Sequence, residues 1–168
     1  MMRNNIFLLI IMCSFFSCNQ GSLSDKLSGS YTYHEGLNGY RDILKNKNIE
    51  SITNDRNFEY LKENIYSEVI DYCYNEDFIL VKQKPNKKYH IKALLFELED
   101  IYSSSRSKFL ADSLINNDVY YKQIFDNEIN YWIIDNKNEI LLGPFQKKKY
   151  LHKRNDLKIP QELELKQE

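Results

Sequence analysis

The sequence is poor in cysteine, with three cysteines in 168 residues. Cys13 and Cys18 fall at the N-terminus, in a segment that we expect to be removed or modified, so Cys73 is the one thiol left for the expected domain. We therefore expect no internal disulfide. A lone thiol in an oxidising compartment should be buried, and the strand-like sequence around Cys73 suits that expectation.

An excess of charge of either sign is also missing. The chain has 23 basic and 24 acidic residues and a formal net charge of −1. Proteins that bind nucleic acid usually carry a basic surface, so nucleic acid is not the expected partner.

Metal and cofactor motifs are missing as well. His34, His90 and His152 are far apart in the chain and have no histidine or cysteine at the short spacings of zinc sites. The glycine patterns of dinucleotide sites and of phosphate-binding loops do not occur. We expect no metal and no cofactor.

The apolar run at Ile6–Phe16 covers 11 positions, whereas a helix that crosses the hydrocarbon core needs about 20. The run follows the basic start MMRNN and is followed by small Ser17, which together are typical of an export signal. The segment thus predicts a cleaved signal rather than a membrane span.

Phe15-Phe16-Ser17-Cys18 resembles the lipobox of bacterial lipoproteins, in which the cysteine receives a diacylglyceryl group and becomes the first residue. Leucine is usual where this chain has Phe15. Cys13 competes, but it follows bulky Met12, and a cysteine in a signal that is cut elsewhere is a further alternative. We predict a lipoprotein signal peptide at 1–17 and lipidation of Cys18.

Lipidation of Cys18 would also indicate the compartment in which the protein is found. Each buried methylene contributes about 0.8 kcal/mol, so two or three acyl chains hold a protein to a membrane essentially permanently. Polar residues 18–28 are expected to form a flexible tether, and Asn19 rather than aspartate after the cysteine is typical of lipoproteins sent to the outer membrane. We expect the protein in the bacterial cell envelope, on the periplasmic face of the outer membrane.

Alternating apolar residues predict strands, which we expect at 29–35, 40–44, 68–74, 78–84, 131–135 and 139–142, with Gly143-Pro144 closing the last hairpin. Residues 46–57 read as a loop, and Phe58, Leu61 and Ile65 are spaced for a short helical face. The stripe from Ile91 to Leu114 predicts either one long helix or two that break at Ser103–Ser105, and Asp118 can cap a further turn.

A basic amphipathic helix is predicted at 145–156, with Phe145, Tyr150 and Leu151 facing inward. Its lysines 147–149, together with Lys153 and Arg154, can also meet anionic lipid headgroups, although a solvated helix face is the default. Together the segments predict an α+β domain at 29–160, with an antiparallel sheet built from hairpins, helices packed on one face, and a C-terminal tail at 161–168.

Three blocks carry a family resemblance: LSGSYTYHEG (27–36), VIDYCYNEDFILVKQKP (69–85) and YWIIDNKNEILLGPF (131–145). They resemble a family of small, uncharacterised bacterial lipoproteins, whose pattern is structural rather than catalytic. The helical stretch at 90–126 is longer than that pattern expects. The resemblance implies location and domain limits, and it implies no activity.

Aromatic residues are abundant, with 13 tyrosines and 9 phenylalanines. Rigid aromatic rings bind partners at low entropic cost. Five tyrosines are candidates for one strip of sheet, which is either the core face under the helices or an open binding platform: Tyr31, Tyr33, Tyr72, Tyr74 and Tyr131.

Clustered carboxylates at Glu97, Glu99 and Asp100 have the spacing of a solvated helix face, and we predict a non-catalytic protein. The expected function is binding of a protein partner in the periplasm, as an accessory or immunity-type module. The alternative is a glycan-binding or hydrolytic protein of the cell wall, which predicts a concave pocket with carboxylates from two elements or a histidine.

Overall fold

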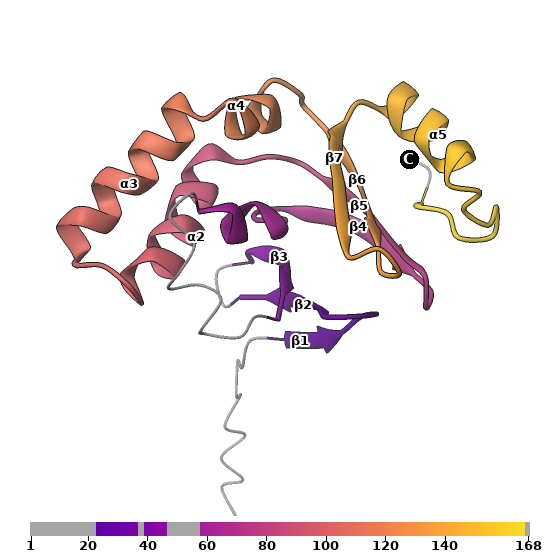
Figure 1. The fold of residues 1–168 in the computed structure, drawn as a ribbon, viewed down its shortest axis with the longest axis horizontal. Helices are drawn as coiled ribbons and strands as arrows, with labels where there is room; N and C mark the ends of the chain where they lie inside the picture. Colours follow the sequence, from indigo (N-terminus) through magenta and orange to yellow (C-terminus); the bar gives the residue numbers. More distant parts are fainter. Residues whose placement is uncertain (1–22, 37–38, 47–57, 167–168) are drawn as a thin grey trace, which may run out of the picture.

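A computed structural model describes residues 23–36, 39–46 and 58–166 (Figure 1). The predicted signal peptide and Cys18 lie outside the described residues, as does nearly all of the loop expected at 46–57. In chain order the elements are β1 (Leu23–Lys26), β2 (Tyr31–Glu35), β3 (Arg41–Lys45), the 3-10 helix η1 (Glu59–Glu63), β4 (Val69–Tyr74), β5 (Phe78–Gln83), α2 (Lys87–Glu99), α3 (Ser104–Asn117), α4 (Val119–Phe125), β6 (Asn130–Asp135), β7 (Ile140–Phe145) and α5 (Lys147–Asp156).

Within the described residues, the strands form two antiparallel sheets rather than one. The first has the order β1-β2-β3 and the second has the order β4-β5-β6-β7, so the predicted hairpins are present. The expected tether at 18–28 is corrected in its second half, because β1 pairs with β2 from Leu23 opposite Glu35 to Lys26 opposite Thr32. Backbone pairing is available to polar side chains too, so the polar composition of this segment did not reveal the strand.

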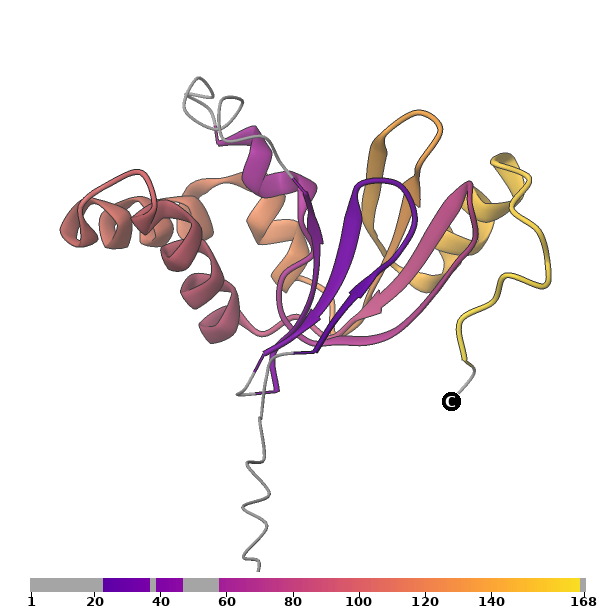
Figure 2. The same ribbon diagram turned by 90° about the horizontal axis from the view of Figure 1, so that it is seen from below.

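The predicted α+β class is confirmed, and the arrangement of its helices needs one correction. Helices α2, α3 and α4 lie on one side of the four-stranded sheet, while α5 lies on the other (Figures 1 and 2). Ile79 and Val81 of β5 belong to the larger core, whereas Leu80 belongs to the smaller core under α5. A strand that is apolar on both faces needs a cover on both faces.

The C-terminal segment completes the smaller core. Leu163 and Leu165 are buried there beside Tyr150 of α5. The expected tail at 161–168 is therefore packed against the domain over these residues. Leu151, expected to face inward, is instead exposed, and Phe145 ends β7 rather than beginning the helix.

The long helical stripe divides into α2 and α3 at the serines, which decides between the two sequence alternatives. Asn86 caps α2 by accepting a hydrogen bond from the Tyr89 backbone N–H, and Ser103 is the extended residue before α3. No helix of the described residues combines the length and the hydropathy that a bilayer crossing would require.

Gly143 lies inside β7 rather than closing the hairpin. Its φ is +137°, and a Cβ placed there would lie 2.6 Å from Cε3 of the buried Trp132. Only glycine accepts both the backbone conformation and the contact.

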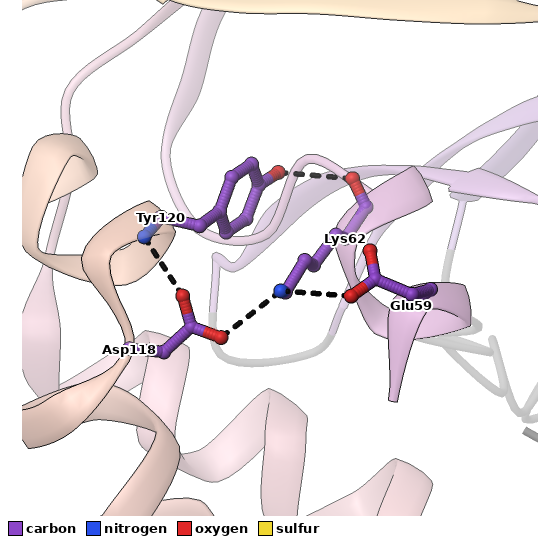
Figure 3. A network of polar contacts seen from close by, with 4 residues as sticks. All are labelled: Glu59, Lys62, Asp118 and Tyr120. Carbon is purple, nitrogen blue, oxygen red and sulfur yellow. Dashed lines mark hydrogen bonds and ion pairs between the residues drawn. The ribbon is translucent and has the colours of Figure 1, made fainter. Parts of the chain in front are cut away.

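A polar network joins η1 to the start of α4 (Figure 3). Lys62 Nζ lies 3.1 Å from Glu59 and 3.0 Å from Asp118, and Asp118 accepts the Tyr120 backbone N–H at 2.8 Å. The Tyr120 hydroxyl donates to the Lys62 carbonyl at 2.9 Å. These bonds fix the position of η1.

Ile65 follows η1 and exchanges two backbone hydrogen bonds of 2.9 Å with Ile43 of β3. The expected helical face at Phe58, Leu61 and Ile65 is thus a short 3-10 turn followed by a bridge. The bridge sets the next residues, Tyr66 and Ser67, beside β3.

Candidate binding cleft

A cleft of about 460 Å³ lies between the β2–β3 hairpin and α2, and its lining is mainly apolar and aromatic. Its lining residues are His34, Gly36, Tyr40, Asp42, Leu44, Tyr66, Ser67, Tyr89, Lys92, Ala93, Phe96 and Glu97. Its volume falls in the range of small-molecule sites, which is roughly 300–1,000 Å³.

One face of α2 forms a wall of the cleft. Tyr89, Lys92, Phe96 and their neighbours repeat every three or four residues, which places them on a single helical stripe. Leu94 and Leu98, both buried in the larger core, lie on a different face. Helix α2 therefore packs with one face and leaves another for the cleft.

Two tyrosines and a lysine hold the hairpin against α2. The rings of Tyr40 and Tyr89 meet edge to face with centroids 4.1 Å apart. Lys92 Nζ donates to the Tyr40 hydroxyl at 3.2 Å and lies 5.8 Å from the centre of its ring. Contacts of this kind join residues that are about fifty positions apart in sequence and give this wall a defined shape.

Asp42 is the half-buried carboxylate of the cleft. It accepts a hydrogen bond from the Ser67 backbone N–H and lies opposite His34 in the pairing of β2 with β3. Burial raises the pKa of Asp42, while the Ser67 N–H and nearby His34 act in the opposite direction. Desolvation is the larger effect, so the fold destabilises the charged form of the Asp42 carboxylate.

A second carboxylate, Glu97 of α2, also lines the cleft. Burial is the main cause that raises the pKa of neighbouring Tyr66, and the charge of Glu97 adds to it. The fold thus brings two carboxylates and a histidine from three elements to one concave surface.

Phe96 marks the rim. Its side chain is 72% exposed and extends the apolar lining of the cleft to the protein surface. Phe109 on α3 is 71% exposed but does not line the cleft, so exposure alone does not distinguish the site.

The structure divides the five candidate tyrosines. Tyr31 and Tyr33 are buried in the larger core, and Tyr72 stacks on Tyr33 with centroids 4.7 Å apart. Tyr74 shares the face of Tyr72 but is 47% exposed. Tyr131 lies on the opposite face of the sheet, stacked on Tyr150 at 4.9 Å. The five do not form one strip.

The three histidines have different surroundings. His34 lines the cleft, His90 is buried in α2, and His152 is exposed on α5. In the described residues, no three His, Cys, Asp or Glu side chains are grouped so that they could hold a metal ion.

Sequence reasoning missed Tyr40, Asp42, Lys92 and Phe96. One signal was present, because Phe96 falls off the apolar stripe of its helix, where a buried phenylalanine would not be expected. The approach of α2 to the hairpin had no signal in local sequence.

By its fold and its cleft, this is a small α+β protein with a cleft lined in large part by apolar and aromatic side chains. Residues 38–168 match the model of a family described as Protein of unknown function (DUF3997), and the chain belongs to that family. The matched region includes β3 and α2, the two elements that face each other across the cleft. Searches of curated proteins and of solved structures each gave no match.

Proposed function

We propose that the chain is a lipid-anchored protein of the bacterial cell envelope, whose cleft binds an apolar or aromatic side chain of a periplasmic protein partner. The anchor is Cys18, and its support is the order of a basic start, an apolar run of 11 residues and Ser17-Cys18. The protein acts as an accessory or immunity-type module at the outer membrane.

The observation that carries the binding function is the position of Phe96. It lies at the rim of a cleft lined by Tyr40, Tyr89 and Leu44. A partner side chain that enters the cleft would bury the apolar surface of these residues. Lys92, Asp42 and Glu97 supply the few polar contacts that orient a bound group.

The anchor is tested with a Cys18→Ser variant. We expect the parent to have the mass of a diacylated or triacylated mature chain and to sediment with outer membranes, and the variant to lose both properties. Equal mass and equal fractionation of the two forms would exclude lipidation at Cys18.

The cleft is tested by photocrosslinking in the bacterium that produces the protein. A benzophenone side chain at position 96 should capture one defined envelope protein, whereas the same group at position 109 should not, because the two sites are equally exposed and only Phe96 lines the cleft. Capture of the same proteins at both positions, or of none at position 96, contradicts the proposal.

A second candidate function rests on Asp42, Glu97 and His34. Carboxylates from β3 and α2 that line one concave surface are what a glycan-binding or hydrolytic protein of the cell wall requires. Purified peptidoglycan fragments incubated with the full chain test it. Release of new reducing ends that an Asp42→Asn and a Glu97→Gln variant both lose would favour this candidate over protein binding.

A further inference from the structure

A second cavity lies on the other side of the four-stranded sheet, where α5 and the C-terminal segment cover β5 and β6. It has a volume of about 570 Å³. Among the residues that the structure describes, four cationic side chains line it, Lys82, Lys147, Arg154 and Lys166, together with the carboxylate of Glu164. The described lining therefore has more cationic than anionic side chains, in a protein whose net charge is −1.

The cations come from four places in the chain. Lys82 belongs to β5, Lys147 begins α5, Arg154 lies in its last turn and Lys166 follows the buried Leu165. Lys82 is only 7% exposed and shares its sheet face with Leu80. Like charges gathered beside a low-dielectric core repel each other, so an anion bound among them would be stabilising.

Arg154 is held in place by the C-terminal segment. Its Nη2 donates to the carbonyl oxygens of Pro160 at 3.2 Å and of Leu163 at 2.6 Å, and its guanidinium carbon lies 5.9 Å from the centre of the Tyr150 ring. A guanidinium has five N–H donors, so these two bonds do not use all of them. A fixed guanidinium loses little entropy when it binds an oxyanion.

The mouth of the cavity is positioned by the same segment. The Lys166 backbone N–H donates to Asp71 of β4 at 2.6 Å, which ties the tail across the sheet. The side chains of Lys147 and Lys166 are exposed, and within the described residues neither one forms an ion pair. Two ammonium groups are thus available where a ligand would enter.

The wall beside these cations is apolar. Tyr131 and Tyr150 stack at 4.9 Å with an angle of 27°, and Leu151 is 46% exposed at the lining. We infer that this cavity is a binding site for a phosphate group, carried either by a phospholipid headgroup or by a free phosphate ester. A phosphate monoester has up to about two negative charges and three acceptor oxygens, and the phosphodiester of a phospholipid headgroup has one charge shared by two such oxygens. Either group can accept hydrogen bonds from a fixed guanidinium and from several ammonium groups at once.

The site is independent of the cleft beside α2, from which the four-stranded sheet separates it. It is tested on the purified full chain in neutral detergent micelles, by calorimetry and by amide shifts of residues 164–166. The probes are inorganic phosphate, glycerol 3-phosphate, and micelles that contain phosphatidylglycerol or phosphatidylcholine.

The test variant is Lys147→Gln combined with Lys166→Gln, since both side chains are exposed and their loss leaves the core intact. Lys148→Gln is the matched control, an exposed lysine of the same helix that does not line the cavity. We expect saturable binding that the double variant weakens about tenfold and that the control leaves unchanged.

Binding of the two soluble probes supports the site and identifies free phosphate esters as its ligands. Binding that needs phosphatidylglycerol in the micelle, and that the double variant loses, supports the site with a lipid headgroup as the source. No saturable binding of any probe, or an equal loss in the Lys148→Gln control, overturns the inference.

Discussion

Acid should destabilise this protein through one histidine. His90 of α2 is 1% exposed and is surrounded by the rings of Tyr66, Tyr121 and Phe125, with centroids 5.2, 5.4 and 5.4 Å away. Neither ring nitrogen has a hydrogen-bond partner among the described residues. Burial lowers the pKa of His90 from 6.5 to about 3, because the charged imidazolium has nothing there to replace water.

The direction of the pH effect on stability follows from the protonation of His90 in the folded and the unfolded chain. In the unfolded chain His90 takes up a proton below about pH 6.5, whereas in the folded chain it stays neutral down to about pH 3. Stability is therefore fully present above about pH 6.5 and falls as the pH decreases below it, by about 1.4 kcal/mol per pH unit. At about pH 5 the loss is about 2 kcal/mol, a large part of a typical folding free energy of about 5–15 kcal/mol.

Urea unfolding of the full chain at about pH 8 and about pH 5 measures this loss. The single tryptophan, Trp132, is fully buried, so its fluorescence reports on the core. A His90→Phe variant keeps an aromatic ring in the cage and removes the titration. We expect the parent to lose about 2 kcal/mol more than the variant between the two pH values.

Other titratable groups also change the stability with pH, but they are the same in the parent and in His90→Phe, so they cancel in the comparison. The raised pKa of Asp42 acts in the opposite sense, since a buried carboxylate becomes easier to accommodate as the pH falls. Exposed His152, whose Nε2 lies 3.8 Å from Asp156, supplies the control, and His152→Gln should behave like the parent. If the parent and His90→Phe lose equal stability on acidification, the reasoning is refuted.

Three further predictions concern stability and reactivity. Gly143→Ala should lower the free energy of unfolding by several kcal/mol, on the order of 3, because the new methyl group would lie 2.6 Å from Trp132 at a positive φ. Asp118→Ala removes the cap of α4 and one of the two carboxylates that pair with Lys62, and it should cost about 1–2 kcal/mol in urea unfolding. Burial raises the pKa of the Cys73 thiol to about 11, so iodoacetamide at about pH 8 should modify the Cys73 peptide about a hundredfold more slowly in the folded chain than in urea, by mass spectrometry.

Matched changes separate these effects from general damage. Gly36→Ala should be mild, because a Cβ there would meet Tyr40 at an ordinary 3.8 Å, and Asp112→Ala should be nearly neutral, because that residue is exposed within α3. The argument for Gly143 is wrong if Gly143→Ala is as stable as Gly36→Ala, and the argument for Asp118 is wrong if Asp118→Ala is as stable as Asp112→Ala. Equal rates of alkylation of Cys73 in the folded and the urea-unfolded chain would contradict the argument for its raised pKa.

Local pattern was enough for most elements. Alternation around Tyr72 and Ile79, with Asn75 between them, predicts the hairpin of β4 and β5, and the Asn75 side chain accepts the backbone N–H groups of Asp77 and Phe78 to close the turn. Asp118 was predicted as a cap from its type and place, and it is one. In each case the interaction spans a few residues, so the sequence contains both partners.

Register and burial on two faces were only partly predictable. Phe78 to Val81 is apolar at every position, which is compatible with a cover on both faces, yet a helix on the second face was not expected. Strand β1 has four exposed residues, and its pairing with β2 is made by backbone atoms that any side chain permits.

The amino-acid sequence by itself determined the hairpins, the cap at Asp118 and the basic and apolar start from which the lipid anchor is proposed. Tertiary structure alone decided that His34 and Asp42 lie across a cleft from α2 and that Tyr131 lies on the opposite sheet face from Tyr72. It also decided that Lys82 and Lys166 line one cavity with two cations of α5. The reason is physical: periodicity and capping depend on neighbours along the chain, whereas the side chains opposite a given residue depend on which apolar faces pack together.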